Sequence, residues 1–209
     1  LSGGMDSATL LWHLLAAGDE VKALTVDYGQ RHRREIDSAV LLAKCAGVPH
    51  DIADLSGLRR LLSGSALTDG AVAVPHGHYA EESMKLTVVP NRNMILLAVA
   101  IGHAVSLGFG AVSYGAHSGD HAIYPDCREV FASAMNTAAM LCDWQEIRLV
   151  RPFIGMTKGE IARLGGRLGV PFHLTWTCYE GGELPCGKCG ACVERREAFE
   201  FAGIEDPLG

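Results

Sequence analysis

Surplus positive charge is the feature that this sequence most clearly lacks. Among its 209 residues, 18 Lys and Arg stand against 24 Asp and Glu, which gives a formal net charge of −6. Proteins that bind nucleic acid through its phosphates normally display an excess of Lys and Arg over a broad surface. The composition therefore argues against direct nucleic-acid binding and leaves room only for a small local basic patch.

Long apolar runs are also absent. No stretch approaches the length that crosses a bilayer, so we expect no membrane-spanning segment. The hydrophobic fraction of 48% and the charged fraction of 20% are those of an ordinary soluble globular protein with enough material for a core. An initiator Met is missing as well, and we expect the natural N-terminus, with a first central strand, to lie before Leu1. A targeting peptide is therefore neither indicated nor excluded.

The first seven residues, LSGGMDS, lead directly into a predicted helix. Behind them, apolar residues recur at helical spacing at Leu10, Leu11, Leu14 and Leu15. Gly3 and Gly4 therefore lie at the N-terminus of a helix, where unpaired N–H groups and the helix dipole favour an anion. Ser2 and Ser7 add hydroxyl donors to the same place. The pattern predicts a phosphate-binding loop.

This loop is not a Walker loop, because the Gly-Lys-Ser/Thr ending is absent. Residues 2–7 instead resemble the SGGxDS pyrophosphate loop of ATP-pyrophosphatases, which cleave ATP between its α- and β-phosphates and pass AMP to an oxygen. The alternative is a serine–glycine turn that only caps a helix. All six motif positions stand in front of a helix, which favours the phosphate loop.

Strand-like and helix-like segments alternate along the rest of the chain, which predicts an α/β fold with a doubly wound parallel sheet. The resemblance to ATP-pyrophosphatases implies that this fold is Rossmann-like, of the adenine nucleotide alpha hydrolase-like kind. The expected strands are 21–26, 50–53, 111–115 and 147–150, and the expected helices are 33–46, 55–62, 94–107, 127–141, 157–168 and 193–202. Ligands of such sheets bind beyond the carboxyl ends of the strands. We therefore expect residues 2–7 and 27–32 to share that rim.

Residues 63–87 show no clear periodicity, and we interpret them as a long loop that covers the site. The loop contains His76 and His78. Isolated loop histidines are more often solvated than bound to metal, so we assign these two no role.

Four of the seven cysteines crowd together near the C-terminus, which suits metal ligation in a reducing cytosol better than a disulfide framework. They are Cys178, Cys186, Cys189 and Cys192. Four thiolates satisfy tetrahedral zinc in a closed, structural site, and an iron–sulfur cluster is the main rival. We therefore expect residues 1–172 to form the ATP-pyrophosphatase domain and residues 173–209 a small zinc-binding segment held together by the metal.

Three further groups have candidate roles. His32 follows the strand 21–26 and has an unperturbed pKa of about 6.5, so it either moves protons or is structural. Asp126 and Glu129 match a helix capping box, whereas Arg128 beside them suits a carboxylate or phosphate, and Cys127 between them needs no role beyond structure. Lys158 in the first turn of a helix opposes the dipole preference and indicates that an anion is bound nearby, the alternative being a solvated surface lysine.

Taken together, the motifs resemble one family closely, that of 7-cyano-7-deazaguanine synthases. The matching stretches are LSGGMDSATLL at 1–11, DYGQRH at 27–32, PNRN at 90–93, YPDCR at 124–128 and TWTCYEGG…CGKCGAC at 175–192. The resemblance implies that 7-carboxy-7-deazaguanine, ammonia and two ATP give 7-cyano-7-deazaguanine. The carboxylate is adenylated, ammonia forms the amide, and a second adenylation on the amide oxygen leads to the nitrile.

The resemblance also implies roles for individual residues. ATP with Mg²⁺ would be held by Leu1, Ser2, Gly3, Gly4, Met5, Asp6, Ser7, Ala8, Thr9, Leu10 and Leu11. Catalysis would involve Ser2, Asp6, Ser7, Lys158 and Arg128. The deazapurine and its carboxylate would be gripped by residues among Gln30, Arg31, His32, Arg92, Asp120, Asp126 and Arg128. Zn²⁺ would be held by Cys178, Cys186, Cys189 and Cys192. The family forms homodimers, and we expect a cytoplasmic protein whose other partners are these small molecules.

One stretch departs from the family pattern. Residues 116–123 read AHSGDHAI, where many members carry a stretch such as D-x-S-G before YPDCR. The added His117 and His121 leave room for a related enzyme that uses the same deazaguanine chemistry on another target. A tRNA-modifying ATP-pyrophosphatase is a further alternative that the negative charge and the chain length disfavour. A zinc-stabilised nucleotide-binding module without catalysis is the alternative outside the enzymes.

Overall fold

Helices alternate with short parallel strands along the chain, which confirms the α/β fold predicted from the sequence. The computed structural model describes residues 1–62, 64–77 and 82–209, so Ser63 and His78 of the predicted covering loop lie outside the described residues. Two compact units are present. The first unit comprises Leu1–Val89 with Lys158–Gly209, and the second comprises Pro90–Thr157.

The first unit contains one pair of strands and most of the helices. Its elements are α1 (Met5–Ala17), β1 (Ala23–Asp27), α2 (Arg34–Ala46), β2 (His50–Asp54), η1 (Ser56–Arg60), η2 (Glu82–Thr87), α5 (Lys158–Leu168), η5 (Phe172–Leu174) and α6 (Gly190–Ala202). Strands β1 and β2 run parallel, with Ala23 opposite His50 and Asp27 opposite Asp54. The carboxyl end of β1 therefore leads directly into the DYGQRH stretch.

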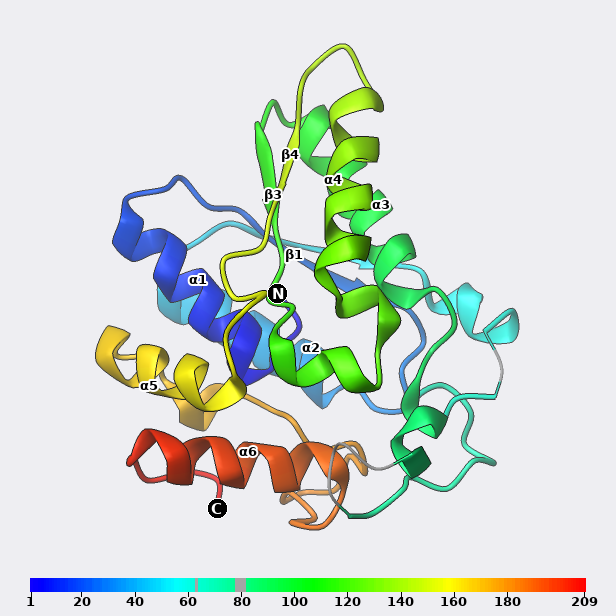
Figure 1. Cartoon of the computed structure of the whole chain (residues 1–209), viewed down its shortest axis with the longest axis vertical. Helices are drawn as coiled ribbons and strands as arrows, with labels where there is room; N and C mark the ends of the chain where they lie inside the picture. Colours follow the sequence, from blue (N-terminus) through cyan, green and yellow to red (C-terminus); the bar gives the residue numbers. More distant parts are fainter. Residues whose placement is uncertain (63, 78–81) are drawn as a thin grey trace. The chain divides into compact units, whose positions relative to one another are not determined.

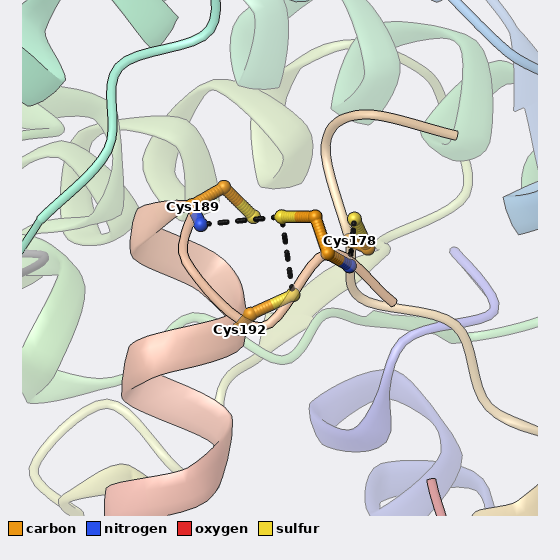
Figure 2. A group of neighbouring side chains, drawn as sticks. Cys178, Cys189 and Cys192 are labelled. Atoms are coloured by element: carbon orange, nitrogen blue, oxygen red, sulfur yellow. Dashed lines mark hydrogen bonds between the residues drawn. The ribbon is translucent and has the colours of Figure 1, made fainter. Parts of the chain in front are cut away.

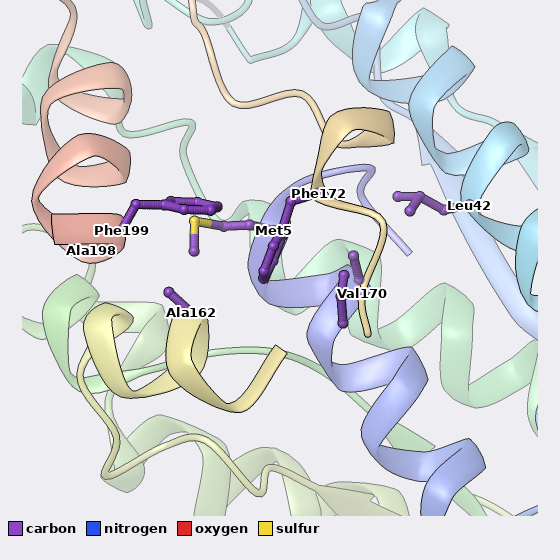
Figure 3. Close-up of a cluster of buried hydrophobic side chains, with 8 residues drawn as sticks. Met5, Leu42, Ala162, Val170, Phe172, Ala198 and Phe199 are labelled. Atoms are coloured by element: carbon purple, nitrogen blue, oxygen red, sulfur yellow. The ribbon is translucent and has the colours of Figure 1, made fainter. Parts of the chain in front are cut away.

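The main core of the first unit lies where four helices meet, and α5 and α6 run side by side there (Figure 1). Its buried members, drawn in Figure 3, are Met5, Ala8, Leu42, Ala162, Val170, Phe172, Ala198 and Phe199. The rings of Phe172 and Phe199 pack edge to face with their centroids 4.9 Å apart. Because this core takes residues from both sides of the predicted boundary at 172/173, the C-terminal helix is packed into the first unit.

The second unit contains the other pair of strands. Its elements are α3 (Arg92–Ser106), β3 (Ala111–Ser113), η3 (Ser118–Ala122), η4 (Pro125–Cys127), α4 (Glu129–Leu141) and β4 (Arg148–Val150). Strands β3 and β4 are parallel, with Ala111 opposite Arg148. Helices α3 and α4 lie side by side (Figure 1), and a small core forms around Ile101, Ala104, Ala139 and Ile147.

Several local predictions need correction. The expected helix 127–141 is divided into η4 and α4, and Arg128 is the N-cap residue of α4. The capping box at Asp126 and Glu129 is therefore wrong, since Asp126 Oδ2 accepts a hydrogen bond from the backbone N–H of Asn93 at 3.1 Å. The last helix begins at Gly190, three residues before the expected start.

The stretch 63–87 was expected to be a long loop that covers the site. Its described residues instead include η2 and a group of side chains with at most 1% exposure: Ser65, Ala66, Thr68, Met84 and Thr87. Polar residues within this group are satisfied locally, as when Thr87 Oγ1 donates to the carbonyl of Met84 at 2.6 Å. This stretch is thus a packed part of the first unit. No helix of the described residues has both the length and the apolar character needed to cross a bilayer.

Candidate active site and metal centre

The predicted phosphate loop is closed by its own two serines. Ser2 Oγ donates to Ser7 Oγ at 2.9 Å, and Ser7 Oγ also lies 3.1 Å from the backbone N–H of Ser2 and from the carbonyl of Gly4. Helix α1 starts at Met5 with Gly4 as its N-cap, and the described residues provide no side-chain cap there. The N–H groups at the start of α1 therefore lack a side-chain cap, as the motif predicts for an anion site.

Gly3 fits this loop because of its backbone angle and its surroundings. Its φ is +83°, and a Cβ at this position would collide with the carbonyl oxygen of Glu35 in α2. The carbonyl of Gly3 in turn accepts a hydrogen bond of 2.9 Å from the backbone N–H of Trp176. The loop is thus held between α2 on one side and the segment leading to the cysteines on the other.

We expect the substitution Gly3→Ala to weaken both folding and ATP binding. A non-glycine residue at positive φ costs on the order of 1–3 kcal/mol, and the collision with Glu35 displaces the loop as well. Denaturant unfolding and isothermal titration with ATP measure the two effects. Gly18→Ala is the matched control, since Gly18 also has positive φ but has no neighbouring atom within 4 Å of the added Cβ. Equal ATP affinity in the two variants would contradict the role given to Gly3.

Lys158 lies beside the phosphate loop, as expected for a residue that acts on phosphates. It is the first residue of α5, is 9% exposed, and places its Nζ 3.3 Å from Asp6 Oδ2 and 2.6 Å from Glu194 Oε2. Two carboxylates of the protein thus surround this lysine, and the bound anion expected from the sequence stays a prediction. Asp6 belongs to the loop, whereas Glu194 comes from α6 and was not anticipated.

The DYGQRH stretch forms a turn that is strongly held by its own side chains. Gln30 Oε1 accepts from the backbone N–H of Tyr28, and Asp27 Oδ1 accepts from that of Gly29, both at 3.0 Å. Arg31 donates from its guanidinium to the carbonyl of Val72 at 3.1 Å. Gln30 and Arg31, both candidates for substrate contact, thus fix the turn and the stretch that follows η1.

His32 lies against the cysteine segment. Its ring meets that of Trp176 edge on, with centroids 6.5 Å apart, and a Cβ on Gly181 would overlap it. Burial lowers the pKa of His32 below its ordinary value, and the neighbouring Cys178 acts in the opposite direction. In the structure, His32 is thus a packing residue beside the cysteine segment. Its expected contact with the substrate stays a prediction.

The four predicted metal ligands converge. The Sγ atoms of Cys178, Cys186, Cys189 and Cys192 all lie within 4.8 Å of one another, and Figure 2 shows three of them pointing to a common centre. Tetrahedral zinc with Zn–S distances of about 2.3 Å places its sulfurs roughly 3.8 Å apart. The Sγ atoms of Cys186 and Cys192 lie 4.0 Å apart, close to this value. The donor set and spacing therefore fit one tetrahedral ion.

Hydrogen bonds around the cluster favour thiolates. The backbone N–H groups of Cys186 and Cys189 each donate to a cysteine sulfur at 3.3 Å. Thiol donors from Cys189 and Cys192 hold the pKa of Cys178 well below its ordinary value, while the pKa of Cys192 is raised by the same sharing of protons. A cation is the natural partner for such a group of sulfurs, because binding it requires the protons to leave.

A second group of polar residues lies in the second unit. Asn93 at the start of α3 donates its backbone N–H to Asp126, and its amide group lies 3.3 Å from Cys127 Sγ. Burial, followed by the charges of Asp120 and Asp126, raises the pKa of Cys127, which agrees with an unreactive structural thiol. The Arg92 guanidinium stacks over the Tyr124 ring at 5.9 Å. PNRN and YPDCR, which are far apart in sequence, thus meet in space.

The remaining two candidates of this unit lie in and after η3. Asp120 lies within η3, with a side chain that is 16% exposed, 3.5 Å from His117 Nε2. Arg128 uses its Nε to bind the carbonyl of His121 at 2.8 Å. Arg92, Asp120, Asp126 and Arg128 therefore belong to one local cluster, as the matching motifs suggest.

Comparison with known proteins identifies the family of this chain. The family model of the queuosine biosynthesis protein QueC matches residues 1–203. This chain belongs to the QueC family. The 7-cyano-7-deazaguanine synthase of Methanoregula boonei is 55% identical over 208 residues, covering 100% of this chain and 95% of the relative. The synthases of Archaeoglobus fulgidus and Marinobacter nauticus are 53% and 51% identical, over 100% and 99% of this chain and 87% and 93% of their own lengths.

Among solved structures, the U34-tRNA thiolase NcsA from Methanococcus maripaludis, determined with its [4Fe-4S] cluster, matches with a TM-score of 0.52. The match covers 82% of this chain and 55% of that protein at 15% sequence identity. At this identity the likeness concerns the fold alone. It agrees with the α/β fold seen in this QueC chain.

Sequence reasoning missed three residues that position the site. Glu194 forms an ion pair with Lys158, and the backbone N–H of Trp176 binds the carbonyl of Gly3. Arg195 is 3% exposed. Its guanidinium pairs with Asp206 at 2.8 Å and donates to Thr175. Glu194 and Arg195 stand in the helix sequence VERRE, which looks like an ordinary solvated face. Only the tertiary structure distinguishes them from the exposed charges around them.

Proposed function

We propose that this chain is an ATP-dependent 7-cyano-7-deazaguanine synthase, a carbon–nitrogen ligase that converts 7-carboxy-7-deazaguanine and ammonia into the nitrile. The observation that carries the proposal is similarity over the whole chain, at 51–55% identity, to proteins named as such synthases. The arrangement of the SGGMDS loop, Lys158 and the four cysteines supports it. Two adenylations are required, one on the carboxylate and one on the intermediate amide.

In this mechanism the phosphate loop holds the ATP tail. The first-turn N–H groups of α1 and the hydroxyls of Ser2 and Ser7 face the pyrophosphate that leaves, and Lys158 adds a cation next to Asp6. Mg²⁺, when bound with ATP, neutralises charge on the pyrophosphate, and Asp6 is the loop carboxylate suited to hold it. The chain's own task is to hold the phosphates and to exclude water from the activated acyl group.

The second unit supplies the groups suited to the deazapurine. Arg92 and Arg128 provide guanidinium forks for the substrate carboxylate, and Asp120 and Asp126 provide acceptors for its ring N–H groups. Contacts of Gln30, Arg31 and His32 with the substrate stay predictions. Amide formation then needs only ammonia and an AMP leaving group.

The assignment is tested by mass spectrometry of the protein incubated with MgATP, ammonium and 7-carboxy-7-deazaguanine. We expect the nitrile, with two AMP and two pyrophosphate for each product molecule. Accumulation of AMP with the amide alone would mean that the final dehydration belongs elsewhere. Absence of AMP formation in the presence of this substrate would overturn the proposal.

The metal at the four cysteines is proposed to be a single structural zinc. An iron–sulfur cube attaches each cysteine to a different iron atom, so its sulfurs stand further apart than sulfurs that share one ion. The observed grouping within 4.8 Å supports the single ion. Metal analysis of protein purified without oxygen decides the question, because zinc without iron or sulfide supports our proposal and iron with sulfide contradicts it.

We also propose that the enzyme works in the cytoplasm as a homodimer and has no direct contact with nucleic acid. The grouped thiols suit a reducing compartment, and the net charge of −6 disfavours a phosphate backbone as partner. Light scattering coupled to size exclusion tests the dimer, and a mass near 22.3 kDa would contradict it.

A further inference from the structure

His117 is a buried histidine in the stretch where this chain departs from the usual family pattern. It is 1% exposed and stands immediately before η3, in an extended conformation. Its Nδ1 accepts a hydrogen bond of 3.1 Å from the backbone N–H of Gly119. A ring nitrogen that accepts carries no proton, so in the neutral ring the proton is on Nε2.

The protonated nitrogen faces Asp120. The distance from His117 Nε2 to Asp120 Oδ2 is 3.5 Å, and the Asp120 carboxylate reaches the surface with 16% of its side chain exposed. The Asp120 carboxylate therefore lies near the buried N–H of His117, while part of it remains accessible to a ligand. An N–H behind a carboxylate fixes its orientation toward whatever it binds.

The turn that carries both residues is held at its two ends. Ser118 donates through its backbone N–H and its hydroxyl to the carbonyl of Met156, at 2.9 and 2.7 Å. At the other end, Arg128 binds the carbonyl of His121. Asp120 is thus placed on a rigid support, as expected of a residue that recognises a ligand.

Asp126, the other acid of this cluster, already has one of its two oxygens engaged by the protein. Its Oδ2 accepts the backbone N–H of Asn93 at 3.1 Å and so fixes the start of α3. Replacing Asp126 would disturb a helix terminus, whereas Asp120 faces an imidazole in a side-chain pair. Of the two carboxylates, Asp120 is the better placed to meet a substrate.

We propose that Asp120 accepts the ring N–H and the 2-amino group of the deazaguanine, and that His117 is the positioning residue that holds Asp120 for this contact. The inference rests on the proposed function, and it assigns the recognition of the guanine edge to one pair. A carboxylate presents two oxygens side by side, which matches the two adjacent donors of that edge. No group is transferred in this step, which is binding alone.

Two substitutions of His117 distinguish its two possible roles, which are to hold Asp120 in place and to cap η3 by accepting from Gly119. His117→Gln keeps a donor near the place of Nε2 but loses the acceptor for Gly119, and His117→Asn keeps that acceptor but cannot reach Asp120. We expect His117→Asn and Asp120→Asn to raise KM for 7-carboxy-7-deazaguanine by roughly 10- to 100-fold, as for a lost hydrogen bond to a charged group. His117→Gln should stay within about threefold of the native enzyme on the same scale. KM for ATP should not change in any of the three.

The opposite pattern overturns the inference. If His117→Asn behaves as the native enzyme and His117→Gln is impaired, His117 only caps η3. If Asp120→Asn keeps its KM, the carboxylate does not touch the substrate.

An analogue without the 2-amino group gives a second test that needs no His117 variant. The native enzyme should discriminate against it strongly and Asp120→Asn much less; equal discrimination would count against the contact. Failure of the native enzyme to bind the deazaguanine in calorimetry refutes this inference, whereas binding without nitrile formation refutes only the proposed function.

Discussion

Replacing Lys158 by methionine is expected to destabilise the protein by about 3–5 kcal/mol, the usual cost of removing one partner from a buried ion pair. The substitution leaves Asp6 and Glu194 facing each other, with side chains that are only 21% and 11% exposed. Two carboxylates without their shared cation repel each other and lack the water that screens surface charges. Urea unfolding monitored by circular dichroism measures the loss.

The same change should abolish most of the ATP-dependent activity, since Lys158 is the cation next to the phosphate loop. The double variant Lys158→Met with Glu194→Gln separates the two effects. Removing the second negative charge should restore much of the stability, because the remaining Asp6 no longer faces another carboxylate. Activity should stay low, because the cation is still missing. Recovery of full activity in the double variant would show that Lys158 acts only through the fold.

Lys22→Met provides the matched control for Lys158→Met. Lys22 pairs with Asp51 at 2.7 Å, but both side chains are well exposed, at 25% and 44%. Ion pairs of this kind contribute about 0–1 kcal/mol. Equal losses of stability in the two lysine variants would contradict the buried arrangement around Lys158.

The position of this lysine shows how far local sequence reasoning extends. A lysine in the first turn of a helix contradicts the dipole preference, and that conflict predicted a bound anion near Lys158, which stays a prediction. The structure places two protein carboxylates beside the lysine. One of them, Asp6, was already part of the predicted loop. The other, Glu194, is 36 residues further along the chain and is brought there by the packing of α5 against α6. No spacing rule connects residues that meet only through tertiary structure.

The wrong prediction of a capping box at Asp126 has a similar cause. The pattern of Asp126 and Glu129 fits a capping box, and nothing local argues against it. In the structure, Asn93 offers its backbone N–H to Asp126 from the start of another helix, and the chain makes a separate short turn before α4. The Asp126 carboxylate therefore accepts a backbone N–H from a distant part of the chain, where the capping box predicts one from its own helix. By contrast, helix α2 and the four cysteines were predicted well, because a repeated apolar stripe and a fixed ligand spacing are local properties.

Removal of the metal is expected to affect the phosphate loop as well as the cysteine segment. Trp176 lies two residues before Cys178, binds the carbonyl of Cys178 through its ring nitrogen at 2.9 Å, and donates its backbone N–H to Gly3. The Arg34 guanidinium packs on the same ring at 4.9 Å. Whatever holds the cysteines therefore also holds Trp176, and through it the carbonyl of Gly3.

Two treatments remove the metal, namely dialysis against a strong chelator and the substitution Cys186→Ser at the most exposed member of the cluster. Apparent metal-binding energies of structural zinc sites, about 10–16 kcal/mol in peptides, rival the entire stability of a domain. We therefore expect a large fall in Tm and early proteolysis after residue 173. Cys45→Ser, at an exposed cysteine of α2 outside the cluster, should leave Tm and ATP affinity unchanged.

ATP affinity decides whether the metal acts beyond its own segment. Loss of the Trp176 hydrogen bond on Gly3 corresponds to about 0.5–1.5 kcal/mol, a weakening of ATP binding by roughly two- to tenfold. Titration of ATP into metal-free protein at a temperature where α1 and α2 remain folded gives this number. Return of zinc should restore both the affinity and the resistance to protease. If the metal-free protein were cleaved in its C-terminal segment yet bound ATP as tightly as before, the cysteine cluster would stabilise only that segment. The link from Cys178 through Trp176 to Gly3 would then have no part in nucleotide binding.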